Sequence, residues 1–423
     1  IELFIGEKMK KILFVSPTGT LDNGAEISIY HLMAHLAKKG HKVINVAPIY
    51  LGEPENMHDE YIANFASQSI ETHLLRAAKW WWEDAPGGLP ADEETRTYYY
   101  RENISRIKNI IIDNEIDLVI SNTVNVFQGA VAAACESTAH FWLIHEFPFD
   151  EFAYYASKID FIEEQSDEIY SVDGLLNLEL NNLFTSNIRK FVPYSDIEKI
   201  TLKNGNISRL VCVGRISERK NPLELIKAFS QVNINNLELV FIGNSDENVQ
   251  KECQDYINKK NIKNINFVGY MENPWEYFTD KDIFVSSSSL ETFGLVYVEA
   301  LLNGIPTIIS DNPGYRSAMK IFEIGQMYEL GNVEQLTQVI KEVVSNYDFY
   351  KKNSLENLEK VQQRYSVENC YKELVESIET LPVVENKPLR HLSKLLTINP
   401  PRTVYNSYLG RVKRKVKKLL KKV

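Results

Sequence analysis

The sequence predicts an α/β protein with two domains, each a parallel sheet covered by helices. Short apolar runs alternate with segments of helical period in two separate series along the chain. Such alternation is typical of parallel sheets, because a helix carries the chain back between neighbouring strands. The chain has 423 residues, enough for two or three domains with cores of their own. Its 44% hydrophobic and 25% charged residues are typical of a globular protein.

The first series defines a predicted N-terminal domain over residues 9–195. Its first strand is expected at 12–16, after Met9; residues 1–8 precede it as an added or upstream segment. A helix is expected at 25–39, with apolar residues at helical spacing, and Gly40 ends it. Further strands are expected at 43–47, 118–120 and 141–144, and a further helix at 127–135.

This rhythm is interrupted between about 50 and 103, which we interpret as an insertion. The stretch contains Trp80–Trp82, a Pro- and Gly-rich turn at 86–90 and Tyr98–Tyr100. An aromatic cluster beside a turn would line an acceptor cleft or rest on a membrane interface. Packing against the domain is an equal alternative.

The second series predicts a C-terminal domain over residues 196–365, after a linker near 193–206. Five strands and two helices are expected in its first part: strands at 210–213, 237–242, 264–268, 283–285 and 307–309, and helices at 222–229 and 248–257. The region 333–380 is amphipathic and helical, and we expect a helix in 366–385 to cross back to the first domain. Residues 386–423 form a basic tail.

Two carboxylates lie eight positions apart in the second domain. Glu291 precedes an expected helix at 296–302 and Glu299 lies within it, with Gly294 between them. A glycine at a strand-to-helix junction lets backbone N–H groups approach a ligand closely. The pattern suits a ligand with polar groups at two ends, such as a sugar nucleotide. An acidic helix cap plus an acidic surface position is the alternative.

A pair of cations follows the first strand of the same domain. Gly214 and Arg215 end that strand, and Lys220 comes just before a helix that opens with Pro222. Two cations beside a helix N-terminus would bind a diphosphate. Two solvated surface cations are the alternative.

These motifs together resemble those of the family 4 glycosyltransferases. Residues 291–299 match the E-x7-E motif, residues 300–306 match its usual continuation, and Gly214, Arg215 and Lys220 match the family's donor-phosphate pair. The resemblance covers roughly residues 9–380 and is weak between 50 and 115. It implies the GT-B fold, two Rossmann-like domains with parallel sheets facing a central cleft. It also implies sugar transfer with retention, by front-side attack, from a nucleotide diphosphate to an acceptor hydroxyl.

The resemblance assigns roles to individual residues. Asn23–Glu26 resembles the family's G-G-A-E loop with Asn23 in place of the first glycine, and Asn23 also suits a helix N-cap. His145, followed by Glu146, matches a histidine that contacts the donor sugar, and Tyr270 and Met271 would lie near the base. The expected catalytic residues are Glu291, His145, Arg215 and Lys220. The expected donor-binding residues are Gly24, Gly214, Arg215, Lys220, Gly243, Glu291, Thr292, Phe293, Gly294, Leu295 and Glu299.

No metal or other cofactor is expected. Asp280 and Asp282 have the spacing of a divalent-metal clamp, but they precede a strand and we interpret them as loop residues. Four cysteines lie far apart and form no disulfide framework, which favours a reducing cytoplasm. No apolar run approaches the ~20 residues of a membrane-spanning helix.

The charge of the chain is concentrated at its end. Twelve of the 47 Lys and Arg lie between Lys387 and Val423, where there is no Asp or Glu. Within 411–423, eight cations alternate with apolar residues at helical spacing. This is typical of an amphipathic helix lying on an anionic membrane. A disordered tail or RNA binding are alternatives, but no nucleic acid is expected.

The sequence thus predicts a metal-independent retaining glycosyltransferase, attached peripherally to the cytoplasmic face of a bacterial membrane. Its acceptor would be a glycan, a lipid-linked glycan or a protein, in capsule, O-antigen, teichoic acid or glycolipid assembly. Alternatives are another GT-B activity, such as a sugar-nucleotide epimerase or a phosphorylase, and a non-catalytic sugar-nucleotide-binding protein.

Overall fold

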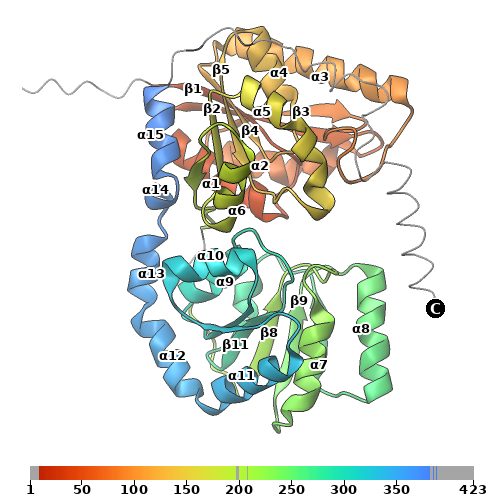
Figure 1. Cartoon of the computed structure of the whole chain (residues 1–423), viewed down its shortest axis with the longest axis vertical. Helices are drawn as coiled ribbons and strands as arrows, with labels where there is room; N and C mark the ends of the chain where they lie inside the picture. Colours follow the sequence, from red (N-terminus) through yellow and green to blue (C-terminus); the bar gives the residue numbers. More distant parts are fainter. Residues whose placement is uncertain (1–8, 197–199, 207, 382–383, 385–386, 388–423) are drawn as a thin grey trace, which may run out of the picture. The chain divides into compact units, whose positions relative to one another are not determined.

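The computed structural model describes residues 9–196, 200–206, 208–381, 384 and 387. The chain forms two compact units (Figure 1). The first contains the chain up to Val172, Leu176–Pro193 and the part from Cys370 onward; the second contains Asp173–Leu175 and Tyr194–Asn369. The predicted tail at 386–423 lies outside the described residues, except for Lys387.

The first unit is built on a seven-stranded sheet in the order β3-β2-β1-β4-β5-β6-β7. Every neighbouring pair of strands is parallel. The strands are β1 (Lys11–Val15), β2 (Lys42–Tyr50), β3 (Glu71–Ala77), β4 (Leu118–Asn122), β5 (Ala139–Ile144), β6 (Glu168–Val172) and β7 (Arg189–Phe191). The helices are α1 (Gly24–Lys38), α2 (Asp59–Ser67), α3 (Glu93–Asn114), α4 (Gln128–Cys135), α5 (Ile159–Gln165) and α6 (Leu175–Leu183), with 3-10 segments at Glu55–His58 and Asp150–Lys158.

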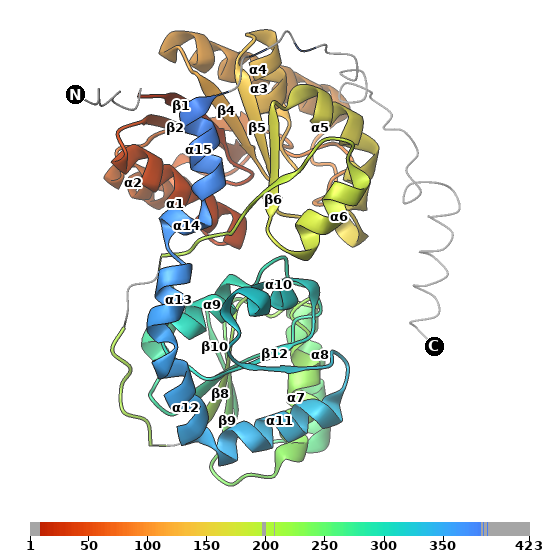
Figure 2. The same ribbon diagram turned by 60° about the vertical axis from the view of Figure 1, so that its left-hand side comes forward.

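Alternate residues of the strands face two helical layers. Ile44 and Val46 of β2 and Leu75 of β3 pack with Ile107 and Ile111 of α3 in one buried cluster. α1 occupies the other face of the sheet, beside α15 (Lys372–Thr380) (Figure 2). Ser28 of α1 and Tyr371 lie 2.6 Å apart through their hydroxyl groups.

The stretch at 50–103 contributes a strand and buried side chains to the core of the first unit, so its interpretation as an insertion was wrong. β3 pairs with β2 over seven residues, and Trp80 and Trp82 are fully buried. Their indole N–H groups donate to Ser16 O at 2.8 Å and Val124 O at 2.6 Å. β3 is an edge strand with a mixed polar sequence, and its pattern is therefore weak.

The second unit holds a six-stranded parallel sheet in the order β10-β9-β8-β11-β12-β13. The strands are β8 (Arg209–Val213), β9 (Glu238–Ile242), β10 (Ile265–Gly269), β11 (Asp282–Ser286), β12 (Thr307–Ser310) and β13 (Gln326–Tyr328). The helices are α7 (Pro222–Val232), α8 (Glu247–Lys260), α9 (Leu295–Leu302), α10 (Pro313–Phe322), α11 (Val333–Ser345), α12 (Tyr347–Glu356) and α13 (Leu358–Arg364), with a 3-10 segment at Pro274–Tyr277. Two parallel α/β domains confirm the predicted fold class.

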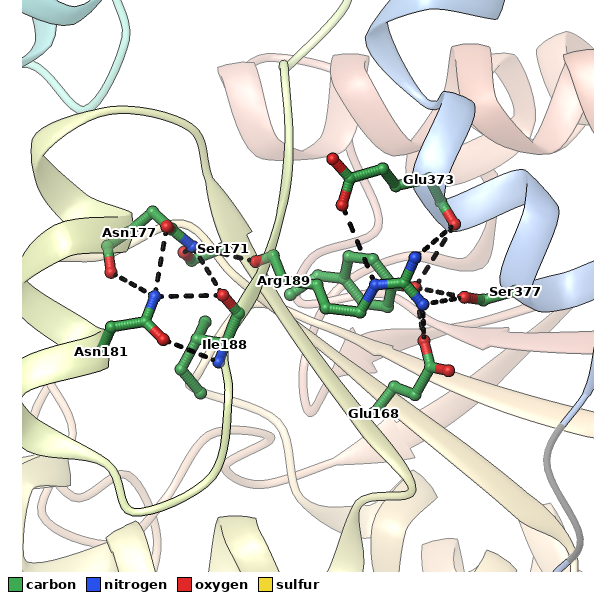
Figure 3. A network of polar contacts seen from close by, with 9 residues as sticks. Glu168, Ser171, Asn177, Asn181, Ile188, Arg189, Glu373 and Ser377 are labelled. Carbon is green, nitrogen blue, oxygen red and sulfur yellow. Dashed lines mark hydrogen bonds and ion pairs between the residues drawn. The ribbon is translucent and has the colours of Figure 1, made fainter.

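The chain returns to the first unit through α14 (Val367–Cys370) and α15. Arg189 of β7 fastens α15: its guanidinium donates to Glu168 Oε2 at 3.0 Å and to the hydroxyl of Ser377 (Figure 3). The guanidinium also lies 5.3 Å from the centre of the Tyr170 ring. Among the described residues, no helix combines the length and apolarity that crossing a bilayer requires.

Candidate active site

Two glycines bring the ends of β8 and β9 into close contact in the second unit. Gly214 and Gly243 have φ values of 126° and 147°, which side chains rarely adopt. A Cβ on Gly243 would lie 2.2 Å from Gly214 O, and one on Gly214 would lie 3.4 Å from Lys220 Cε. Both positions therefore favour glycine. They lie at the carboxyl edge of a parallel sheet, where ligands bind in open α/β folds.

Lys220 and Glu291 form an ion pair at this edge. Lys220 Nζ donates to Glu291 Oε1 at 2.6 Å, and both side chains are largely buried, with 14% and 10% exposed. Arg219 adds a second cation, donating to Glu291 Oε2 at 3.3 Å and to Leu290 O at 2.9 Å. The sequence separated these groups by 71 residues, and the fold places them in contact.

The two cations keep Glu291 ionised. Burial would raise the pKa of this carboxyl, but the charges of Lys220 and Arg219, with hydrogen bonds from Lys220 and Ser288, hold its pKa below the usual 4.5. An anionic Glu291 and two cations leave the cluster with one excess positive charge. The cluster therefore attracts an anion.

The serines at 286–289, at the end of β11 and directly after it, fix the loop at 219–221 against the turn at 291–294. The Ser287 hydroxyl donates to Asn221 O at 2.8 Å, and Ser289 donates to Arg219 O through its N–H at 2.8 Å and its hydroxyl at 2.9 Å. Ser287 and Ser289 thus give this loop hydroxyl donors that apolar residues would lack. Sequence reasoning gave this run no role, although a polar run directly after a buried strand was its signal.

The turn before α9 is shaped by a second pair of glycines. Gly294 has a φ of 91°, and a Cβ there would lie 2.3 Å from the Tyr315 ring. A Cβ on Gly314 would lie 2.4 Å from Glu291 O. Gly294 is the N-cap of α9, so the first N–H groups of that helix lack intrahelical acceptors. Sequence reasoning found Gly294 but missed Gly314, which approaches Glu291 only in three dimensions.

The remaining predicted residues of this motif lie around the same turn. Phe293 is buried, Thr292 is partly buried, and Leu295 begins α9. Glu299 Oε2 accepts a hydrogen bond from Trp275 Nε1 at 3.2 Å. Burial raises the pKa of Glu299, and hydrogen bonds from Ser195 and Trp275 oppose the shift. Glu299 is thus a partly buried acceptor on the helix that starts at the turn.

Arg215 is placed differently from Lys220. Its side chain is 70% exposed and pairs with Asp246 at 2.7 Å. Asp246 in turn precedes α8. The predicted phosphate pair therefore consists of one buried cation and one surface cation with an acidic partner, and the sequence did not indicate that partner. Tyr270, expected near the base, directly follows β10 and is 63% exposed.

In the first unit, His145 and the first turn of α1 are connected through one asparagine. Asn122, the last residue of β4, lies 2.8 Å from His145 Nε2 through Oδ1, and its Nδ2 donates to Ala25 O at 3.2 Å. With the amide in this orientation Nε2 carries the proton, so Nδ1 is an acceptor. Burial lowers the pKa of His145 to about 3. The imidazole is therefore neutral.

The residues expected as a loop, Gly24–Glu26, form the first turn of α1, which Asn23 caps as the sequence suggested. Asn23 Oδ1 accepts from Glu26 N at 3.1 Å, and Gly24 begins α1. Glu26 is fully buried and accepts from Thr18 N at 2.7 Å and from the Thr18 hydroxyl at 2.8 Å. Burial raises the pKa of Glu26 to about 8.

Glu146 is a positioning residue whose role sequence reasoning did not specify. Its Oε2 accepts from Val124 N at 3.1 Å and from His145 N at 3.0 Å. Burial raises its pKa to about 7, against those two backbone hydrogen bonds. Glu146 thus ties the loop after β4 to the backbone of His145.

The Asp280–Asp282 stretch has a structural role. Asp282 is the first residue of β11, not a loop residue as expected, and it binds the Arg209 guanidinium through both oxygens, with Nε at 2.8 Å. Asp280 Oδ1 accepts from Gly205 N at 2.7 Å. Both carboxylates lie at the amino end of β11, away from the edge that holds Lys220.

One segment of the chain matches a protein-family model. Residues 194–360 match the family model "Glycosyl transferases group 1". The matched segment includes Gly214, Lys220, Glu291 and Glu299, so the cluster described above lies within the part of the chain that is similar to this family.

Curated relatives match part of the chain. The poly(glycerol-phosphate) alpha-glucosyltransferase of Bacillus subtilis is 32% identical over 166 residues, 38% of this chain and 24% of that protein. The alpha-monoglucosyldiacylglycerol synthase of Acholeplasma laidlawii is 32% identical over 117 residues, 26% of this chain and 29% of that protein. The capsular polysaccharide glycosyltransferase CapM of Staphylococcus aureus is 23% identical over 38% of this chain and 43% of that protein. These matches span less than half of each relative.

Solved structures share the fold over most of the chain. Anabaena Alr3699/HepE in complex with UDP and glucose superposes with a TM-score of 0.69 at 16% identity, covering 88% of this chain and 100% of that one. Sucrose-phosphate synthase from Thermosynechococcus elongatus gives 0.69 at 15% identity, covering 88% and 99%. The fold of this chain is GT-B, as the motifs predicted.

Proposed function

We propose that this protein is a retaining glycosyltransferase of the family 4 type, moving a sugar from a nucleotide diphosphate to an acceptor hydroxyl. The observation that carries the proposal is the Lys220–Glu291 pair, held between Gly214 and the Gly294 turn at one sheet edge, inside the segment that matches the group 1 model. The relatives are named as a poly(glycerol-phosphate) alpha-glucosyltransferase, a capsular polysaccharide biosynthesis glycosyltransferase and an alpha-monoglucosyldiacylglycerol synthase. Cell-surface glycan assembly in bacteria is therefore the proposed setting.

The proposed mechanism uses charges already in place. Lys220 and Arg215 hold the diphosphate and stabilise the charge that grows on it as the bond between sugar and phosphate breaks. The N–H groups at the start of α9 bind the phosphate, and Glu299 accepts hydrogen bonds from ribose hydroxyls. Glu291 holds Lys220 in position, and the neutral His145 accepts a hydrogen bond from a sugar hydroxyl.

In the transfer itself, the acceptor oxygen bonds to the anomeric carbon on the face that the phosphate leaves. The departing phosphate oxygen takes the acceptor proton, so atoms and charge balance without a separate protein base. Lys220, Arg215 and the helix N-terminus supply positive charge that a metal ion supplies in other enzymes. We therefore propose that turnover continues in excess EDTA.

A two-stage experiment tests this function. Thermal unfolding with UDP, GDP, ADP and their sugars should reveal one nucleotide series that raises the melting temperature, since ligands of the native state stabilise it. The stabilising sugar nucleotide should then release its nucleoside diphosphate on incubation, with EDTA present. Conversion of that donor into an epimer, or stabilisation by none of these nucleotides, would contradict the proposal.

The tail at 411–423, outside the described residues, supports a proposed attachment to the cytoplasmic membrane face. Its eight cations and regular apolar residues suit an anionic surface. The full chain should sediment with phosphatidylglycerol vesicles and not with phosphatidylcholine vesicles, and a chain ending at Lys387 should sediment with neither. Equal sedimentation of both chains would contradict this.

A further inference from the structure

A groove runs along the free edge of the first sheet, outside the site described above. Its floor is the edge strand β3, with Arg76 near its end, and α2 and α3 form its walls. Its volume is about 530 Å³, within the range of roughly 300–1,000 Å³ that ligand sites occupy. Six side chains give it its chemistry: Asp59, Arg76, Tyr98, Tyr99, Glu102 and Arg106.

The lining combines aromatic rings with planar charged groups of both signs. Tyr98 and Tyr99 meet edge to face, with ring centres 5.1 Å apart, and Tyr98 is 58% exposed. Asp59 and Glu102 balance Arg76 and Arg106, and Arg106 Nε donates to Glu102 at 2.8 Å. Carboxylates and guanidinium groups offer pairs of acceptors and donors that match neighbouring hydroxyls, and tyrosine offers an apolar face with a polar tip. Balanced charge favours a neutral polyhydroxy ligand over a polyanion.

The edge of β3 is less suited to a peptide strand. Asn103 Nδ2 donates to Arg76 O at 3.1 Å, so an α3 side chain already bonds a carbonyl that an added strand would use. A sugar chain needs no continuous backbone ladder, and it can use the side chains on both walls.

A second groove lies in the same unit, near the loop before α1. Its volume is about 490 Å³, and it is lined by Tyr50, Ala78 and Trp81, which follow Ile49 and Arg76 of the first groove closely in the chain. Trp81 Nε1 donates to Pro17 O at 2.9 Å, which fixes the indole beside that loop.

We propose that the groove along β3 binds a neutral oligosaccharide, a part of the acceptor distant from its reacting hydroxyl. The inference rests on the proposed function, because it makes the acceptor an extended glycan. Such a site would raise the affinity for long acceptors without taking part in bond breaking. Tyr98, Tyr99 and Arg76 would then set preference for acceptor length.

The test measures binding of maltotetraose, isomaltotetraose and chitotetraose to the full chain by saturation-transfer NMR, with poly(glycerol phosphate) as the anionic probe. At least one tetrasaccharide should bind, and the double variant Tyr98→Ala/Tyr99→Ala should weaken it at least 10-fold while nucleotide binding stays unchanged. The matched control is Phe349→Ala/Tyr350→Ala in α12, another edge-to-face pair with centres 5.3 Å apart, which should bind like the unaltered chain.

Three results would overturn the proposal: no tetrasaccharide binds, only poly(glycerol phosphate) binds, or the Tyr98/Tyr99 variant binds as tightly as the unaltered chain. Failure of the proposed function gives a different result, because the unaltered chain would then bind no nucleotide while the NMR experiment still reports on the groove. A fold defect in the variant would appear as a lower melting temperature, and Arg76→Ala then provides the second variant with the same expected loss.

Discussion

Glu291 in the second unit is ionised beside two cations, whereas His145 and Glu146 in the first unit, equally buried, have pKa values shifted toward their neutral forms. The difference follows from their partners. Glu291 faces Lys220 and Arg219, while Glu146 faces backbone N–H groups and His145 faces an amide. A charge survives burial when an opposite charge is within contact distance.

This contrast suits different ligand groups at the carboxyl ends of the two sheets, the charged edge at Lys220 and Glu291 and the neutral edge at His145 and Glu146. A cluster with spare positive charge suits a diphosphate, and neutral acceptors and donors suit hydroxyl groups. The proposed donor carries both kinds of group, a pyrophosphate and sugar hydroxyls. Each variant below changes the charge or shape of one edge and leaves the other intact.

The largest effect is expected for Lys220→Ala. It removes the buried cation that would bind the diphosphate and leaves Glu291 buried with only the half-exposed Arg219. Donor turnover should fall by about 10²–10³, the usual cost of losing one preorganised donor to a transition-state oxyanion. Release of nucleoside diphosphate measures it, with Lys352→Ala, an exposed cation of α12, as the control. Turnover within 3-fold of the unaltered chain would remove Lys220 from the mechanism.

The next effect concerns the shape of the charged edge. Gly294→Ala forces a Cβ to 2.3 Å from the Tyr315 ring at a φ of 91°, whereas Gly331→Ala has the same strain at 88° with open space around it. Left-handed strain costs roughly 1–2 kcal/mol in both, and overpacking adds about 1–3 kcal/mol only at Gly294. Thermal unfolding should show the larger loss for Gly294→Ala, together with loss of stabilisation by nucleotide. Equal losses of melting temperature in the two variants would mean that the Tyr315 ring moves aside with no cost in stability.

The sequence predicted the charged cluster around Lys220 and Glu291 better than the neutral groups around His145 and Glu146, for a local reason. Gly214 and Lys220 share one strand-to-helix junction, and Glu291, Gly294 and Glu299 share another, so each motif is readable as a short pattern. The contacts that set their state join distant segments: Arg219 with Glu291, Arg215 with Asp246, and Gly314 with the turn. No spacing along the chain predicts these contacts, because only the fold brings the residues together.

The fold was predictable to the same extent. Strands buried on both faces, such as β4 and β5, gave continuous apolar runs. The edge strand β3 gave no such run, because one side of it is exposed. The strands β7 and β13 gave none either, because each has only three residues. The aromatic run at Trp80–Trp82 was visible, but its role in the core depended on carbonyl partners elsewhere.

A pH titration tests the neutral edge. The folded-state pKa of Glu146, about 7, lies above the ordinary 4.5, so its contribution to stability is complete below about pH 4.5 and is lost as the pH rises through 7. Glu146→Gln keeps an oxygen for both N–H donors and cannot ionise. Relative to the unaltered chain it should gain up to about 3 kcal/mol between pH 5 and 8, seen in melting temperatures across that range. Parallel curves for the two proteins would show that burial does not shift this carboxyl.

The smallest effect is expected for a variant of the solvent-exposed pair beside the Lys220–Glu291 cluster. Arg215 and Asp246 form an exposed pair, and such pairs contribute roughly 0.2–1 kcal/mol. Asp246→Asn should therefore leave the melting temperature nearly unchanged. It should lower the KM for the donor by no more than about 5-fold, because Arg215 no longer divides its charge between Asp246 and the diphosphate, and added salt should reduce the gain. A rise in KM would show instead that Asp246 orients Arg215 toward the ligand, and the surface cation would then resemble the buried one in needing its carboxylate.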